Sequence, residues 1–178
     1  QLDDINILLD GNGLGYSYAY TFSDTNNNGQ INLNILALDS AGNSDDSSLS
    51  RIYFDKIPPS VFNLYEGSID SDYVFTKFSD SLQLAWSVIE SGSGSKRSYI
   101  GLGSDSGQVD ILDWSLASEI TQESAKQLSL NNNLKYYGAV YSEDNVGNIS
   151  DSLWGDGIIV DLTPPVPGSI WDGFLNED

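Results

Sequence analysis

Carboxylates are the side chains that could do chemistry in this sequence. Its 178 residues include 26 Asp and Glu against 7 Lys and Arg, for a formal net charge of −19, and there is no Cys, Met or His. The absence of Cys excludes thiolate chemistry and disulfides, and the absence of His removes the usual general base and transition-metal ligand. What remains is oxygen chemistry, which suits hard cations such as Ca²⁺.

Two acidic segments each occur twice. Residues 39–43 (Asp-Ser-Ala-Gly-Asn) return 105 residues later as 144–148 (Asp-Asn-Val-Gly-Asn), and residues 55–59 (Asp-Lys-Ile-Pro-Pro) return 106 residues later as 161–165 (Asp-Leu-Thr-Pro-Pro). We expect their carboxylates to converge at junctions between modules, together with an acidic loop of the next module, because Ca²⁺ needs about six to eight oxygens. The predicted metal ligands are Asp39, Asn43, Asp55, Asp144, Asn148 and Asp161.

The segments at 39–43 and 144–148 also have a purely structural interpretation. In an ordinary turn the glycine supplies a positive φ, and the Asp and Asn side chains bond to nearby backbone. A net charge of −19 favours the ion, because a divalent cation relieves self-repulsion. Both interpretations stay open, and Ca²⁺ is the one cofactor that the sequence suggests.

Other patterns that could indicate a site are weaker. Residues 24–31 resemble the start of an EF-hand loop, but the twelfth position falls on Ile35, so the bidentate Glu is missing and a hairpin turn is favoured. Residues 10–15 resemble a phosphate loop only in their glycines. No pair of carboxylates stands out at a spacing for glycoside hydrolysis. We predict no catalytic residues and no enzyme.

Tryptophans are the remaining binding candidates. Trp114, Trp154 and Trp171 are not all needed by one domain core, and Trp rings commonly stack on sugars. Packing in the core or against a linker is the favoured interpretation.

The elements that must position these residues are β-strands. Apolar or aromatic residues alternate with small or polar ones over 16–22, 31–37 and 82–88, and 136–141 is a nearly continuous apolar run. Residues 115–127 have a broad polar face, and we expect a loop there with at most one helical turn. The predicted fold class is all-β.

The period of about 105 residues matches one β-sandwich per repeat. We predict tandem antiparallel β-sandwiches, with one complete module at 58–163, a module at 1–57 that is truncated at its start, and a linker and first strand of another at 164–178. The paired prolines suit a stiff link or the start of an edge strand. Incomplete modules expose strand edges, so head-to-tail self-association is a further expectation.

Several of these residues resemble immunoglobulin-like and fibronectin type III-like modules of large bacterial surface and secreted proteins. Residues 82–86 (Leu-Gln-Leu-Ala-Trp) are similar to the second strand of a fibronectin type III domain. Leu130, Leu134 and Tyr136 resemble its tyrosine corner, and 136–148 its strand F with the following loop. Residues 5–43 resemble an immunoglobulin-like repeat. The linker at 55–57 (Asp-Lys-Ile) departs from the Asp-Thr-Thr that often precedes Pro-Pro in such proteins.

The resemblance implies a non-catalytic structural or adhesion spacer, secreted or on the surface of a bacterium, with calcium at its module junctions. The alternative is an accessory carbohydrate-binding module of a secreted hydrolase. The expected partners are neighbouring modules and surface glycans. The negative charge argues against nucleic acid, and no apolar run reaches the length of a membrane span.

Overall fold

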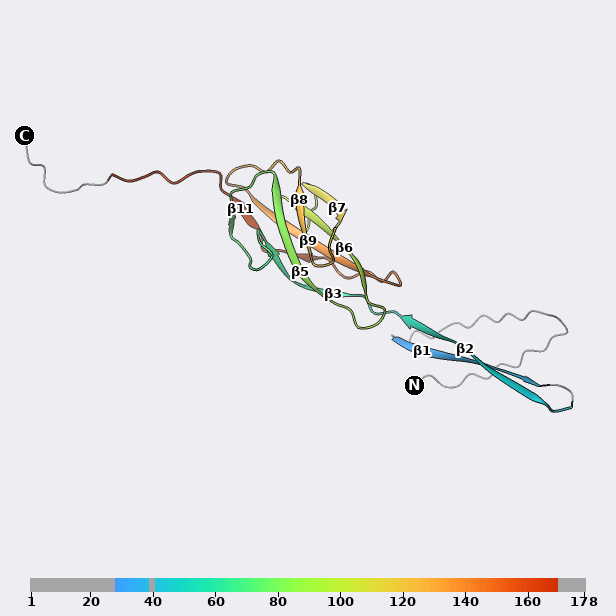
Figure 1. Cartoon of the computed structure of the whole chain (residues 1–178). Helices are drawn as coiled ribbons and strands as arrows, with labels where there is room; N and C mark the ends of the chain where they lie inside the picture. Colours follow the sequence, from blue (N-terminus) through green and yellow to red (C-terminus); the bar gives the residue numbers. More distant parts are fainter. Residues whose placement is uncertain (1–27, 39–40, 170–178) are drawn as a thin grey trace, which may run out of the picture.

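The chain is built from strands. A computed structural model describes residues 28–38 and 41–169, and within these ranges it contains eleven strands and no α-helix (Figure 1). The all-β prediction is confirmed. In the same ranges no helix is long and apolar enough to cross a membrane. The strand predicted at 16–22 lies outside the described residues.

The first two strands form a hairpin that projects from one end of the remaining strands (Figure 1). Strand β1 (Asn28–Leu38) runs antiparallel to β2 (Ser44–Asp55), and its first residue pairs with Asp55. The turn between them contains Gly42 with φ of 88°. That left-handed conformation is the one predicted for the glycine of this acidic segment.

The remaining strands form a sandwich of two sheets. The smaller sheet has the order β3 (Ser60–Glu66), β5 (Ser81–Ile89), β8 (Gln122–Lys126), and both of its pairs are antiparallel. Strand β3 begins directly after Pro59 and pairs only with β5. The prolines therefore precede an edge strand, as proline geometry predicts.

The larger sheet has six strands, which are β4 (Phe75–Thr76), β6 (Ser95–Gly103), β7 (Leu112–Leu116), β9 (Lys135–Asp144), β10 (Leu153–Trp154) and β11 (Ile158–Val160). Their order is β4-β11-β9-β6-β7, with β10 pairing with β9 next to β11. Only the pairing of β4 with β11 is parallel. The last strand of the sandwich is thus split into β10 and β11, with a short glycine-containing segment between them.

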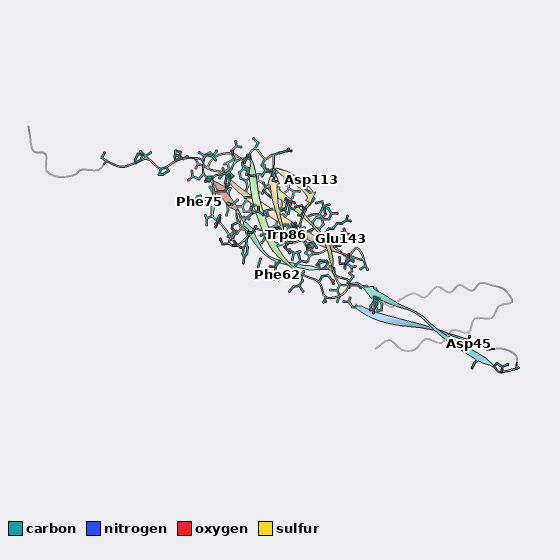
Figure 2. The ribbon with its side chains drawn as sticks, in the orientation of Figure 1. Asp45, Phe62, Phe75, Trp86, Asp113 and Glu143 are labelled. Carbon is teal, nitrogen blue, oxygen red and sulfur yellow. The ribbon has the colours of Figure 1, made fainter. Side chains whose placement is uncertain are left out.

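The core lies between the two sheets and is built by the predicted alternation. In β5, Leu82, Leu84 and Trp86 are all buried, and Trp86 lies in the middle of the sandwich (Figure 2). They pack in one cluster with residues of the larger sheet, among them Ile100, Leu102, Tyr136, Val140, Ile158 and Val160. Burial of these side chains is the main stabilising contribution to the sandwich.

Polar groups within the core are hydrogen-bonded. The indole N–H of Trp86 donates to Ser98 Oγ at 3.3 Å, and that hydroxyl lies 2.7 Å from Ser142 Oγ. At the start of β9 the buried Tyr136 hydroxyl accepts a hydrogen bond from the Asn131 N–H at 2.8 Å. The predicted tyrosine corner is therefore present.

The prediction of a loop or helical turn over 115–127 is wrong. Strand β7 ends at Leu116 within this range, and β8 occupies Gln122–Lys126. Both strands lie at sheet edges, and in β8 only Ala125 is fully buried. Edge strands with one solvated face carry mostly polar side chains, so their pairing is set by the neighbouring strand rather than by local apolar pattern.

Candidate metal site at the junction of hairpin and sandwich

Asp55 ends the hairpin and contacts the sandwich. Its Oδ1 accepts a hydrogen bond from the Ile57 N–H at 3.0 Å, which closes a tight turn before the prolines. Its Oδ2 accepts one from the Ser93 N–H at 2.7 Å, in the turn between β5 and β6. A Cβ at Gly92 would lie 2.3 Å from Asp55 Oδ2, so a side chain at this position would displace the Asp55 carboxylate from the turn.

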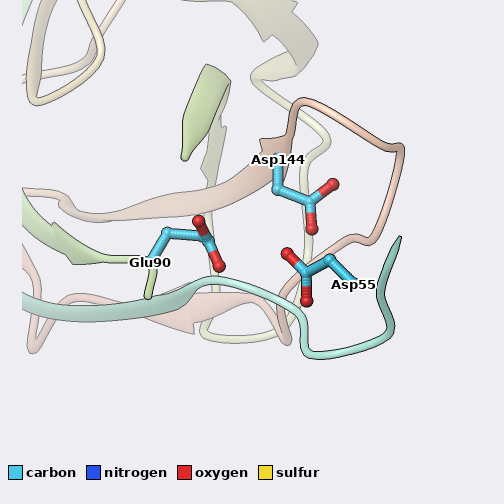
Figure 3. Close-up of side chains that lie close together, drawn as sticks. All are labelled: Asp55, Glu90 and Asp144. Atoms are coloured by element: carbon cyan, nitrogen blue, oxygen red, sulfur yellow. The ribbon is translucent and has the colours of Figure 1, made fainter. Parts of the chain in front are cut away.

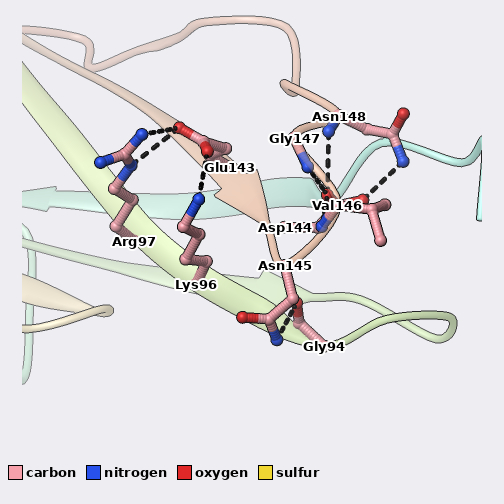
Figure 4. Close-up of polar contacts among 9 residues, drawn as sticks. All are labelled: Gly94, Lys96, Arg97, Glu143, Asp144, Asn145, Val146, Gly147 and Asn148. Atoms are coloured by element: carbon pink, nitrogen blue, oxygen red, sulfur yellow. Dashed lines mark hydrogen bonds and ion pairs between the residues drawn. The ribbon is translucent and has the colours of Figure 1, made fainter.

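Asp144 is fully buried at the end of β9, where it organises the following loop (Figure 4). Its Oδ1 accepts hydrogen bonds from the N–H groups of Val146, Gly147 and Asn148 at 2.7–2.9 Å. The Asn148 side-chain amide donates to Asp144 Oδ2 at 2.6 Å and to the Asp55 carbonyl at 3.1 Å. Gly147 has φ of 96°, so the turn predicted for this segment is confirmed.

Glu90 supplies a third carboxylate, from the residue that follows β5. It accepts hydrogen bonds from the Gly92 N–H at 2.7 Å and from the Gly94 N–H. The Asn145 amide ties the same turn to the Asp144 loop by donating to the carbonyls of Ser93 and Gly94 at 2.9 and 3.0 Å. Backbone N–H donors therefore hold this carboxylate in place.

These three carboxylates converge, and we call the group Asp55, Glu90 and Asp144 the junction site (Figure 3). One oxygen of each lies within 4.8 Å of the others. Burial raises the pKa values of Asp55 and Asp144, but the hydrogen bonds that they accept outweigh burial and leave both pKa values below the usual range. The site therefore holds negative charge at neutral pH.

A buried hydroxyl completes the donor set. Ser93 Oγ has no hydrogen-bond partner of normal geometry, although it lies close enough to Asp55 to help lower the pKa of that carboxyl. Buried hydroxyls usually have a hydrogen-bond partner, so Ser93 Oγ is a candidate oxygen donor beside Asp55. Carboxylate and hydroxyl oxygens are hard donors, so the residues present fit Ca²⁺.

Asn148 lies beside the junction site as a hydrogen-bond donor to Asp144, whereas two other predicted ligands lie away from it. Asn43 is exposed and directly precedes the 12-residue β2, about 40 Å from Asp55 at about 3.3 Å per residue. Asp161 is exposed where the chain leaves the opposite end of the sandwich (Figure 1). Its Oδ1 accepts the Thr163 N–H at 2.9 Å, the same turn that Asp55 makes. Asp39 lies outside the described residues.

A second group of carboxylates was not predicted from the sequence. Glu66 is fully buried and accepts hydrogen bonds from the N–H groups of Gly138 and Gly157, between β9 and the break separating β10 from β11. Burial raises its pKa to about 7, and the nearby Asp72 and Asp156 carboxylates act in the same direction. One oxygen of each of the three acids lies within 4.8 Å of the others. No local pattern marks Glu66 as buried.

Two of the three candidate tryptophans, Trp114 and Trp154, are not core residues, so the prediction of core packing is wrong for them. Trp114 and Trp154 lie half-buried on the outer face of the larger sheet, with ring centroids 6.2 Å apart. Trp114 also meets Tyr141 edge-on at 4.8 Å. The two side chains thus pack on the sheet surface. Trp171 lies outside the described residues.

Comparison with known proteins does not identify a family. No family model matches the sequence, and no curated protein matches it. The resemblance to immunoglobulin-like and fibronectin type III-like modules therefore rests on the sequence residues named above.

Proposed function

We propose that this chain is a non-catalytic spacer or adhesion module of a large bacterial extracellular or cell-surface repeat protein, stiffened by calcium where the hairpin meets the sandwich. The observation that carries the proposal is the junction site. It brings Asp55, from the end of the hairpin, beside Glu90 and Asp144 of the sandwich. A bound cation would therefore connect two separate parts of the chain.

The donor set is suited to this role. Each carboxylate already accepts backbone N–H bonds, so its position is fixed before an ion arrives. Ser93 Oγ offers a fourth oxygen, and water would complete a shell of about six to eight ligands. Calcium would neutralise the three converging charges, whose mutual repulsion otherwise opposes contact between hairpin and sandwich.

The arrangement of the ends supports a linear spacer. The hairpin joins one end of the sandwich, and the chain leaves from the opposite end (Figure 1). Asp161 makes the same turn there as Asp55 and is exposed. It can therefore present a carboxylate to the loops of a following module or of a second copy. The bacterial and extracellular setting is supported by the sequence resemblance.

The test is calcium binding, measured by titration calorimetry and by thermal unfolding with Ca²⁺ or EDTA. Asp55→Asn should abolish binding and the calcium-dependent rise in Tm, because it removes one of three anionic ligands. Asp161→Asn is the matched control, since it changes the same residue in the same turn at the other end. Equal Tm values in Ca²⁺ and EDTA for the unmodified protein would rule out the calcium joint.

A further inference from the structure

The outer face of the larger sheet carries five half-buried aromatic side chains, which we call the aromatic strip. They come from four adjacent strands and are Tyr99, Trp114, Tyr137, Tyr141 and Trp154. The strand alternation directs them away from the core: in β9, Tyr136 and Val140 face inward, and Tyr137 and Tyr141 face outward. Aromatic side chains that lie neither in the core nor free in solvent are typical of binding faces.

Ring contacts link four of the five members of the strip, Tyr99, Trp114, Tyr141 and Trp154. Tyr99 and Tyr141 are cross-strand partners with stacked rings at 4.8 Å. Trp114 lies over Gly101, where a Cβ would come within 3.3 Å of its ring. The next residue across the sheet is Ala139, so small side chains lie at the centre of the face. A rigid, shallow aromatic face loses little conformational entropy when it binds a ligand.

The charges around the strip distinguish it from the rest of the molecule. Three of the chain's seven basic residues lie there. Lys96 and Arg97 both pair with Glu143, at 2.9 and 2.7 Å (Figure 4), and Lys135 lies 5.2 Å from the Tyr137 ring centroid. The strip therefore does not share the strong negative charge of the molecule. Polyanions are disfavoured by the net charge of −19.

We propose that the aromatic strip binds a neutral polysaccharide. Sugar rings have apolar C–H faces that pack on aromatic rings, and their hydroxyls can accept hydrogen bonds from the guanidinium of Arg97, whose side chain is 41% exposed. An uncharged ligand matches a face whose charges are largely paired internally. This binding does not depend on the calcium joint.

The test uses three neutral hexasaccharides, cellohexaose, xylohexaose and chitohexaose, with hexagalacturonic acid as the charged comparison. Binding is followed by tryptophan fluorescence, because Trp114 and Trp154 lie in the strip whereas Trp86 is buried in the core. At least one neutral hexasaccharide should bind saturably. Trp154→Ala should weaken that binding about tenfold or more, as expected for an aromatic anchor.

Phe78→Ala is the matched control, because Phe78 is an exposed aromatic residue outside the strip and its loss should leave binding unchanged. Circular dichroism checks that both variants fold. If Trp154→Ala does not fold, Tyr99→Ala replaces it as the variant of the strip. Three outcomes would overturn the proposal: no binding of any neutral hexasaccharide, binding only of hexagalacturonic acid, or unchanged binding in a folded strip variant. Binding of an acidic or protein partner alone would likewise reject it.

Discussion

Glu66 gives the sandwich a pH-dependent stability. The carboxyl is fully buried between the two sheets and accepts N–H bonds from Gly138 and Gly157. Burial raises its pKa from 4.5 to about 7 in the folded protein. The folded state therefore binds the proton more tightly than the unfolded chain does. The resulting contribution to stability is fully present below pH 4.5 and is lost as the pH rises through 7.

The size of the effect follows from the two pKa values. A rise from 4.5 to about 7 corresponds to about 3 kcal/mol, at about 1.4 kcal/mol per pH unit. Domains of this size are stable by only about 5–15 kcal/mol. We therefore expect Glu66 alone to lower the free energy of unfolding by a substantial fraction between pH 4.5 and pH 8.

The perturbation is Glu66→Gln, and the assay is urea unfolding followed by tryptophan fluorescence from pH 4.5 to pH 8. The amide cannot ionise, so the variant should lack the decline of about 3 kcal/mol that the unmodified protein shows over this range. Its stability at pH 4.5 should be about 1–3 kcal/mol lower, because one side of the amide cannot accept a backbone N–H. The exposed Glu119→Gln is the control. Parallel pH curves for Glu66→Gln and the unmodified protein would refute the reasoning.

Three substitutions test the fold by chemical unfolding. Leu84→Ala removes a side chain with no exposed surface and should cost about 2–5 kcal/mol, and a cost below 1 kcal/mol would contradict its place in the core. Tyr136→Phe removes the hydroxyl that accepts a hydrogen bond from the Asn131 N–H, and it should lower the free energy of unfolding by about 1–2 kcal/mol. The control, Tyr137→Phe on the outer face, should leave the free energy of unfolding unchanged. Gly147→Ala should cost about 1 kcal/mol from backbone strain alone, because φ is 96° and no atom lies near the added Cβ. A stabilised variant would show that the positive φ is not required.

The sequence predicts the central strands of the sandwich well, because burial on one face leaves a clear alternation. Leu82, Leu84 and Trp86 in β5 show this pattern, and the apolar run from Tyr136 marks β9. The short strands β4, β10 and β11 contain only two or three residues each, so no local period defines them. Strands β10 and β11 pair with the longer β9, and β4 pairs in turn with β11, so all three depend on backbone groups that the tertiary fold brings beside them.

The junction site could be predicted only in part from the sequence. Asp55 and Asp144 stand in repeated segments, and the structure brings these two together. Glu90 follows an ordinary strand and precedes a Ser-Gly-Ser-Gly turn, so nothing local places it beside Asp55. Glu66 alternates with Leu64 on the inward face of β3, and its N–H donors come from distant parts of the chain, Gly138 in β9 and Gly157 in the split between β10 and β11.

The central claim is that calcium fixes the hairpin against the sandwich, and the most direct test is a distance distribution between spin labels. The chain has no Cys, so labels at Asn43→Cys, near the hairpin tip, and Asp113→Cys, on β7, would be its only thiol labels. Calcium should narrow the distribution of distances between the two labels, as measured by pulsed electron paramagnetic resonance. Asp55→Asn should prevent the narrowing, and Asp161→Asn should not. Identical distributions with Ca²⁺ and with EDTA would contradict the account.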